Sequence, residues 1–457
     1  MATPGTVVAT RDTRLVERVS ALDLMQLSSD AGAVPNQVGA VLVLDAGCGF
    51  DADVAVTLLG ERIERVPRLR QRLVRVPVGC GRPVWVDDPD FDLAQHVTVV
   101  AAPSGDDAGV LEIAAARVTT PLSMSRPLWS ATFVAGLAGR RVALVVVFHH
   151  VLADGVGGLA VLGQLLDAAV GLSSRRGFPQ PPPTRRQLRA DAGRARLVAL
   201  RRLPTGLRGV RAAVRELDLG RMKPAPLSSL NRPTGPRRRL ATVRTDLAAI
   251  RDLAHGRGAT VNDVVLTAVA GALRRLLLAR GERLDDVVVS VLVAPSTAGG
   301  GGAGNRAGVM PVRLPTGGDP EQRLRAVAAS TRSRKHSTQR GASAVLVAPL
   351  FRLLAALGML RWFIDHQRMV TTFVTNLPGP RDPVRLAGLP VVDMHAVSLT
   401  TGNVTVAFAV LSYRGTLTVT VAADPDHLGD LDLLVAALDD EFRQLAAIIE
   451  HRDPTGV

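Results

Sequence analysis

The sequence contains little of several residue types that mark particular classes of protein. Of its 457 residues, two are cysteines and one is a tyrosine, and aromatic residues make up 3%. Cys48 and Cys80 have no metal-like spacing, so we expect no disulfide framework and read both as small core residues. The net charge of +14 is compatible with nucleic acid as a partner. Aromatic rings for base stacking are scarce and nucleic-acid recognition motifs are absent, so we expect no nucleic-acid partner.

Long hydrophobic runs are also missing. Apolar runs end far short of the roughly 20 residues that a membrane-spanning helix needs. The longest candidate, 342–364, is interrupted by Arg352 and Arg361. The N-terminal stretch lacks the basic-then-apolar layout of a secretory signal. We therefore expect a cytoplasmic protein whose membrane contact, if any, is peripheral on the inner face.

Several catalytic signatures are absent as well. The sequence has no GxSxG elbow, no P-loop and no CxxC pair, which disfavours a serine nucleophile. The glycines of 299–304 fit GxGxxG, but the residues that follow read as a strand where a dinucleotide site needs a helix. We interpret this stretch as a flexible loop. We expect no metal site and no cofactor.

The positive charge is concentrated in one segment. From Arg175 to Arg239 there are 17 arginines and one lysine against three acidic residues, a net charge of +15. This segment is either a solvated linker or a surface for anionic lipid headgroups or polyanionic cofactors. With its proline-rich start it predicts a connector over 171–239, between an N-terminal half over 1–170 and a C-terminal half over 240–457.

Hydrophobic periodicity predicts alternating strands and helices in both halves. Strands are expected at 37–45 and 286–295, and helices at 109–120 and 260–281. The residues 129–150 read as a hairpin with its turn at Ala138-Gly139. Helices that alternate with strands, together with hairpins, predict an α/β fold with mixed sheets in each half.

A double histidine follows the second strand of that hairpin. His149 and His150 begin the motif HHxxxDG, which Asp154 and Gly155 complete. An imidazole at a strand end is suited to accept a proton near neutral pH, and the aspartate can fix the loop that presents it. A pair of core histidines with a capping aspartate is the structural alternative. One metal ion bound by both histidines is disfavoured, because neighbouring strand residues face opposite sides of a sheet.

The motif and its surroundings resemble a known family. HHxxxDG is similar to the signature of the acyl-CoA-dependent acyltransferases with a chloramphenicol-acetyltransferase-like fold. Nearly the whole chain resembles the bacterial wax ester synthase/diacylglycerol acyltransferases, and the matching stretches are "VSALDLMQLSSD", "RVPRLRQRLVRVP", "VWVDDPDFDLAQHV", "RPLWSATFVAGL", "TVNDVVLTAVAGALRR", "GNRAGVMPVRLP", "VTNLPGPRDPVRLAG" and "LSYRGTLTVTVAADP". The glycine-rich 299–304 departs from the family pattern, on what the resemblance implies is the acceptor side of the pocket. The resemblance implies two chloramphenicol-acetyltransferase-like halves joined by the basic crossover, with the active site in a tunnel between them.

The resemblance also implies roles for the motif residues. His150 would be the general base, and His149 would support the site by packing or hydrogen bonding. Asp154 would orient the loop, and Gly155 would be its backbone hinge. No acyl-enzyme is required, since the acceptor hydroxyl attacks the acyl-CoA thioester directly.

Further site residues come from two other matching stretches. Asn262 is a candidate donor to the oxyanion at a helix start, and the alternative is that Asn262 and Asp263 only cap that helix. Pro127, Leu128 and Trp129 either shape the acyl pocket or pack the core, and for the tryptophan core packing is favoured. Asp263 is included with these three among the expected substrate-binding residues.

The resemblance implies an O-acyltransferase that uses acyl-CoA as co-substrate. Its acceptor would be diacylglycerol or a long-chain alcohol, taken from a membrane or lipid-droplet surface, to give triacylglycerol or wax ester. Two alternatives remain: an enzyme of the same fold acting on another acceptor, such as a polyketide or glycolipid, and a catalytically decayed lipid-binding protein. The intact HHxxxDG and Asn-Asp pair argue against the second.

Overall fold

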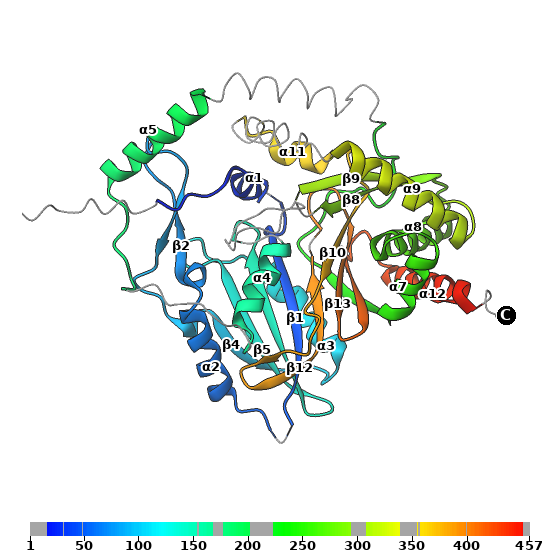
Figure 1. The fold of residues 1–457 in the computed structure, drawn as a ribbon, viewed down its shortest axis with the longest axis horizontal. Helices are drawn as coiled ribbons and strands as arrows, with labels where there is room; N and C mark the ends of the chain where they lie inside the picture. The colour runs from blue at the N-terminus through cyan, green and yellow to red at the C-terminus, as the bar shows by residue number, and fades with distance from the viewer. Residues whose placement is uncertain are drawn as a thin grey trace, which may run out of the picture.

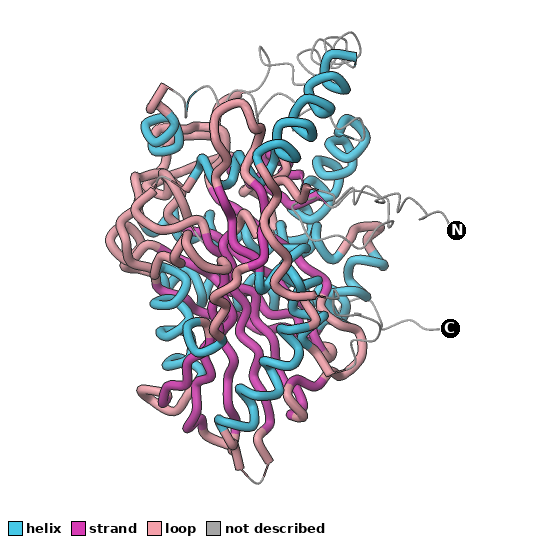
Figure 2. Tube along the Cα trace, turned by 90° about the vertical axis from the view of Figure 1, so that its left-hand side faces the viewer, coloured by secondary structure: helices cyan, strands magenta, loops and turns pink. Residues whose placement is uncertain are grey.

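The computed structural model describes residues 16–30, 32–47, 49–152, 155–167, 177–201, 223–293, 308–338, 354, 357–398 and 400–450. Two six-stranded mixed sheets form the framework, each accompanied by helices (Figure 1). Seen from the side, the strands run through the middle of the molecule with helices along its flanks (Figure 2). The mixed sheets in both halves confirm the predicted α/β class.

The first sheet has the order β11-β12-β1-β6-β5-β4. Only the β4–β5 pair is parallel, and the other neighbours are antiparallel. The predicted strand 37–45 and the predicted hairpin are both present. The strands are β1 (Gln37–Asp45), β4 (Val97–Ala101), β5 (Trp129–Leu137), β6 (Arg141–His149), β11 (Arg385–Leu386) and β12 (Leu389–Val397).

The second sheet has the order β7-β14-β13-β10-β8-β9. Its β10 is parallel to both neighbours, β13 and β8. The strands are β7 (Arg239–Asp246), β8 (Asp286–Val293), β9 (Gly308–Pro315), β10 (Thr372–Pro378), β13 (Val406–Tyr413) and β14 (Thr416–Ala423). A separate small ribbon pairs β2 (Gln71–Val74) with β3 (Val84–Asp87).

The structure differs from the predicted division into two halves in one respect. Strand β12 lies late in the chain but pairs antiparallel with β1, so it belongs to the first sheet. Its side chains Val391, Met394 and Ala396 enter the same apolar core as Leu42 and Leu44 of β1. Pairing with β1 places the apolar face of β12 in that core. Local periodicity does not specify the partner strand, so it does not predict this placement.

Helices cover the sheets, and α1, α2, α3, α7 and α8 begin at side-chain caps. The helices described are α1 (Ala21–Ser29), α2 (Ala52–Glu64), α3 (Asp107–Thr119), α4 (Gly155–Leu165), α5 (Arg185–Arg201), α7 (Leu247–Gly256), α8 (Val261–Ala279), α9 (Pro320–Thr338), α11 (Leu360–Asp365) and α12 (Leu431–Glu450), with 3₁₀ turns η1 (Pro67–Arg70) and η2 (Leu93–Gln95). Helix α8 starts at a capping box of Thr260 and Asp263. Thr260 is the N-cap residue of this helix.

The apolar core joins the two sheets. Leu377 of β10 and Leu411 and Tyr413 of β13 pack in the same buried cluster as β1 and β6. Conversely, Leu240 and Ala422 of the second sheet join the cluster on the other face of the first sheet. The two halves therefore share buried apolar surface, which favours a fixed relative placement.

Among the cysteines, Cys80 is fully buried, as expected for a core residue. Cys48 and the glycines of 299–304 lie outside the described residues, as does most of 342–364. Within the part of the chain that the structure describes, none of the helices is both long enough and apolar enough to cross a membrane.

Candidate active site

The side chain of His149 is closed in by the protein. His149 is the last residue of β6, pairs with Gln37 at the start of β1, and is 2% exposed. Its Nδ1 accepts a hydrogen bond from the backbone N–H of Val151 at 3.1 Å. The hydrogen must then sit on Nε2, which lies 3.0 Å from Oδ2 of Asp30 and donates to it. Both ring nitrogens are thus occupied by protein groups, so His149 has no nitrogen left for a substrate.

His150 occupies a different position. It is the first residue after β6, in a turn, and its side chain is half-buried. Its backbone N–H donates to the carbonyl of Asn36 at 2.8 Å, just before β1 begins. The strand end and this hydrogen bond fix the backbone from which the imidazole projects. A histidine held this way at a strand end has the placement that a general base needs.

Asp30 and Asn36 hold the two histidines in place. The Asn36 backbone N–H donates to Oδ1 of Asp30 at 2.7 Å, and the Asn36 side chain donates to the carbonyl of Gln26 at 3.1 Å. Burial raises the pKa of the Asp30 carboxyl, but the hydrogen bonds from His149 and Asn36 outweigh it and leave the pKa below its usual range. Asp30 therefore stays ionised and orients the His149 ring.

Sequence reasoning missed Asp30 and Asn36 as parts of the site. Asp30 ends the stretch "VSALDLMQLSSD", yet it lies 119 residues from His149. The Ser-x-x-Asp pattern inside that stretch is a capping box, in which Ser20 and Asp23 start α1. No spacing signal could have joined Asp30 to the histidine motif, because the contact depends on where α1 ends in space.

Of the two remaining motif residues, the structure describes Gly155 only. Asp154 lies outside the described residues, so its proposed orienting role stays a prediction. Gly155 is the first residue of α4, at the passage from the motif turn into the helix. Gly155 therefore lies five residues after His150 in the chain, at the N-terminal end of α4.

Asn262 and Asp263 serve different purposes at the start of α8. Asp263 is 2% exposed, and its Oδ2 accepts from the backbone N–H of Thr260 at 2.8 Å. Its Oδ1 accepts from the Thr331 hydroxyl at 2.7 Å. Both carboxylate oxygens are used within the protein, so the placement supports capping and not the expected substrate contact.

Asn262 is not part of the capping box. It is half-buried, and its Oδ1 accepts a hydrogen bond from Nδ2 of Asn376 on β10 at 3.3 Å. That contact directs the Nδ2 group of Asn262, a donor, away from Asn376. The first backbone N–H groups of α8 also lie here, where the helix dipole favours negative charge.

Pro127, Leu128 and Trp129 are buried. The Trp129 indole N–H donates to the carbonyl of Leu69 at 2.7 Å, and its ring stacks on that of His96 with centroids 4.6 Å apart. Burial lowers the pKa of His96 despite its hydrogen bond to the Trp129 carbonyl. Leu128 and Trp129 belong to the core of the first sheet, so their placement supports core packing over direct substrate contact.

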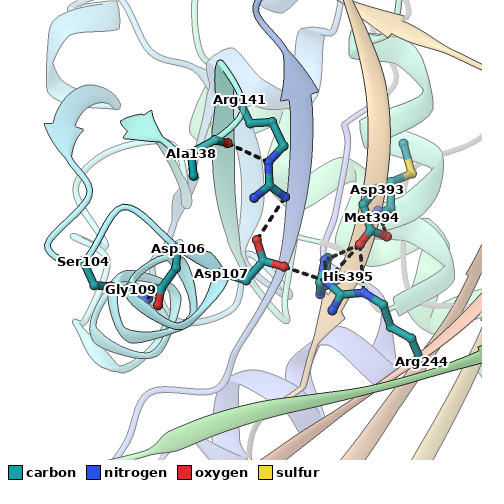
Figure 3. Close-up of polar contacts among 10 residues, drawn as sticks. All are labelled: Ser104, Asp106, Asp107, Gly109, Ala138, Arg141, Arg244, Asp393, Met394 and His395. Atoms are coloured by element: carbon teal, nitrogen blue, oxygen red, sulfur yellow. Dashed lines mark hydrogen bonds and ion pairs between the residues drawn. The ribbon is translucent and has the colours of Figure 1, made fainter.

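A second polar cluster ties the halves together on the other side of the first sheet (Figure 3). Arg244 of β7 contacts Asp107 of α3 at 3.1 Å and Asp393 of β12 at 3.0 Å. His395 lies 3.0 Å from Asp393, and Arg141 reaches the other oxygen of Asp107. Burial raises the pKa of Asp393, but the hydrogen bond from His395 and the charge of Arg244 leave it below its usual range. This cluster fixes β12 beside the second sheet.

Both parts of the chain match models of one protein family. Residues 19–265 match the wax ester synthase/diacylglycerol acyltransferase catalytic domain, and residues 303–446 match the WS/DGAT C-terminal domain. A relative from Mycobacterium tuberculosis (strain ATCC 25618 / H37Rv), named probable diacyglycerol O-acyltransferase tgs1, is 32% identical over 434 residues, 92% of this chain and 93% of its own.

Solved structures agree in fold. The wax ester synthase/diacylglycerol acyltransferase from Marinobacter aquaeolei VT8 superposes with a TM-score of 0.68 at 23% identity, over 95% of this chain and all of that one. The first condensation domain of the CDA synthetase superposes with a TM-score of 0.63 at 19% identity, over 98% of each chain. At these identities the likeness concerns the fold, and it confirms the two-half α/β architecture.

Proposed function

This chain belongs to the wax ester synthase/diacylglycerol acyltransferase family and is an acyl-CoA-dependent O-acyltransferase that makes triacylglycerol or wax ester, and we propose that His150 is its general base. The observation that carries the proposal is the difference between the surroundings of the two histidines. His149 has both ring nitrogens hydrogen-bonded to protein groups and is 2% exposed, whereas His150 is half-buried and follows directly after the strand end.

The reaction follows as one transfer. His150 takes the proton from the acceptor hydroxyl while that oxygen forms a bond to the thioester carbonyl carbon. The carbon–sulfur bond then breaks, and the His150 imidazolium returns the proton to the CoA thiolate. The products are an ester and free CoA, so atoms and charge balance without an acyl-enzyme and without a further cofactor.

The tetrahedral intermediate carries an oxyanion that needs a hydrogen-bond donor. We propose Asn262 for this role. Its Oδ1 is bound by Asn376, which leaves the Nδ2 hydrogens to point toward a substrate oxygen. The start of α8 adds the favourable end of the helix dipole. Asp263 contributes by holding the helix start in place through its capping box.

Diacylglycerol is the acceptor that we propose first. Relatives that cover more than nine-tenths of this chain, at 30–32% identity, are named as diacylglycerol O-acyltransferases. A long-chain alcohol is the second acceptor. Purified enzyme with radiolabelled palmitoyl-CoA, offered diolein and hexadecanol in parallel, decides between them by thin-layer chromatography. Labelled triacylglycerol supports the first acceptor, and labelled wax ester alone would replace it with the second.

We also propose that the enzyme meets these lipids by peripheral binding on the inner face of the membrane or on lipid droplets. Helix α5 supports this placement, because its last two turns stand away from the core (Figure 1). Its side chains Leu197, Val198 and Leu200 are about half exposed or more, and arginines flank them. Apolar side chains among arginines on one exposed helix suit an anionic lipid surface.

A further inference from the structure

Exposed apolar side chains gather on the short helix α11 and on the segments next to it. They are Leu227, Leu357, Met359, Trp362 and Met369, and each is between 40% and 72% exposed. Single apolar side chains scattered over a surface are ordinary, whereas several together mark a contact surface. We call these five residues the α11 patch. Helix α11 lies on the upper side of the molecule in Figure 1, the side toward which the far end of α5 also extends.

Hydrogen bonds hold the two segments of the patch together. The backbone N–H of Ala225 donates to the carbonyl of Arg368 at 2.7 Å, and the Arg368 guanidinium donates to the carbonyl of Ala225 at 3.1 Å. Leu227 follows Ala225 by two residues, and Met369 follows Arg368 directly. These two exposed side chains therefore lie on segments that are bound to each other.

Trp362 differs from the other two tryptophans of the chain. Trp85 and Trp129 are buried in the core of the first sheet, whereas Trp362 is 60% exposed. Its ring stacks on the exposed imidazole of His366, with the ring centroids 5.1 Å apart. An indole has an apolar body and a polar N–H, so it is suited to the boundary between lipid and water.

The exposed charged residues in the two segments 223–227 and 357–369 are all positive. They are Lys223, Arg361 and Arg368. The acidic residue of α11, Asp365, is half-buried and lies 3.7 Å from Arg361. Exposed cations beside apolar side chains complement a lipid surface, where anionic headgroups lie next to acyl chains.

The patch is also bound to a neighbouring loop, residues 400–403. The backbone N–H of Asn403 donates to the carbonyl of Ile364 on α11 at 3.2 Å, and the Asn403 side chain donates to the carbonyl of Gln367 at 2.8 Å. Gly402 has a φ of 60°, and a Cβ there would lie 2.5 Å from the carbonyl oxygen of Ile364. Only glycine allows this close approach, so the loop is held directly against α11.

The same loop reaches the segment that holds the histidines. Oγ1 of Thr401 lies 3.6 Å from the position that a Cβ on Gly32 would take. Gly32 lies between Asp30 and Asn36, which hold the two histidines in place. Helix α11 also lies beside α1, the helix that ends just before Asp30. The α11 patch is therefore connected to the histidine motif by direct contacts along two routes.

We propose that the α11 patch inserts into a lipid surface, and that this contact places the turn carrying His150 next to the lipid phase from which the acceptor comes. The inference rests on the proposed function, in which the acceptor is a lipid. It goes beyond the contact made by α5, because it assigns a second surface, bound to the catalytic segment, whose tryptophan enters the lipid. An interfacial segment buries its apolar face about 5–10 Å deep in the membrane.

The exposed tryptophan provides a direct readout. The full-length protein is mixed with vesicles of phosphatidylcholine and phosphatidylglycerol, with or without bromine in the upper part of the phosphatidylcholine acyl chains. Bromine quenches an indole that enters the lipid, so we expect a loss of up to about a third of the emission, the share of one tryptophan in three. Trp362→Phe keeps the side chain apolar and removes the reporter. This variant should still bind the vesicles, and its remaining emission should not be quenched.

A double variant tests the effect on catalysis. Leu357→Ser together with Met359→Ser should weaken vesicle binding roughly tenfold, because two apolar side chains no longer enter the lipid. Turnover on diolein in vesicles should fall by a similar factor, whereas turnover on detergent-solubilised diolein should stay unchanged. Leu433→Ser, at an exposed leucine of α12, is the matched control and should behave like the wild type.

Equal emission with plain and brominated vesicles overturns the proposal, and so does unchanged vesicle binding in the double variant. If the wild type is not quenched and the double variant turns a dimer into a monomer by light scattering, the patch binds a second copy of the chain and the lipid contact falls. Quenching of Trp362 in a protein that transfers no acyl group would remove the proposed function and leave the lipid contact of α11 in place.

Discussion

The ring of His149 is held between the Asp30 carboxylate, 3.0 Å from its Nε2, and the backbone N–H of Val151, 3.1 Å from its Nδ1. This arrangement fixes the neutral tautomer with hydrogen on Nε2. The neighbouring His150 lies in the turn after β6 and is half-buried, so the two adjacent histidines have different surroundings. A doubled residue in the sequence thus becomes one positioning group and one candidate base.

The first prediction concerns the base. His150→Ala should lower kcat by about 10²–10⁴-fold, the usual contribution of a positioned general base. The thermal midpoint should change little, since the residue is only half-buried. Radiometric turnover and differential scanning fluorimetry on the same preparation measure both quantities.

His149→Ala is the comparison variant. It removes a buried ring and leaves the Asp30 carboxylate without its donor, so it should lower the thermal midpoint more than His150→Ala does. Near-wild-type turnover in His150→Ala, or a larger loss of turnover in His149→Ala at equal fold content, would reverse the two assignments.

The second prediction concerns acid stability. The pKa of Asp30 is lowered in the folded protein, so its ionised form adds stability above the unfolded pKa, and this stability is lost as pH falls through the folded pKa. The window lies below about pH 4, the usual pKa of an aspartate. In Asp30→Asn, the free energy of unfolding measured with urea should be lower than in the wild type at neutral pH. It should also fall less steeply as the pH is lowered.

Asp53→Asn removes an exposed carboxylate on α2 and serves as the control. It should follow the wild-type decline below about pH 4. If Asp30→Asn and Asp53→Asn behave alike at every pH, the carboxylate of Asp30 does not stabilise the motif through His149 and Asn36.

The third prediction separates Asn262 from Asp263. Asn262→Ala should lower kcat by about 10²–10³-fold, as expected for loss of one oxyanion donor, with little change in the thermal midpoint. Asp263→Ala should instead cost at least the ~1 kcal/mol typical of a lost helix cap, because its carboxylate also binds Thr331. Equal losses of stability in both variants would make Asn262 a structural residue only.

The fourth prediction concerns the lipid surface. The protein should float with anionic liposomes at low salt, and less so at high salt, because salt screens exposed arginines. Replacing Leu197 and Leu200 with serine should reduce flotation without changing turnover on detergent-solubilised diolein. Val54→Ser, an exposed valine on α2, is the control and should float like wild type. Equal flotation with neutral and anionic vesicles, or none with either, removes the electrostatic membrane role.

Some features of this protein follow from the sequence alone because they are local. Short apolar runs bounded by turn residues identify β1 and the β5–β6 hairpin, and the Thr260 capping box marks the start of α8. The HHxxxDG motif is contiguous, so its position at a strand end was predictable. Ordered resemblance along the chain indicated the family, which the matched domains then established.

Other features were decided only by the tertiary structure, because they depend on which surfaces meet. The partner of His149 is Asp30, 119 residues away, and β12 crosses into the first sheet beside β1. Sequence periodicity shows that a strand has an apolar face but does not specify its neighbour or its register. Long-range packing, which brings these separate segments together, is what gives the two adjacent histidines different surroundings.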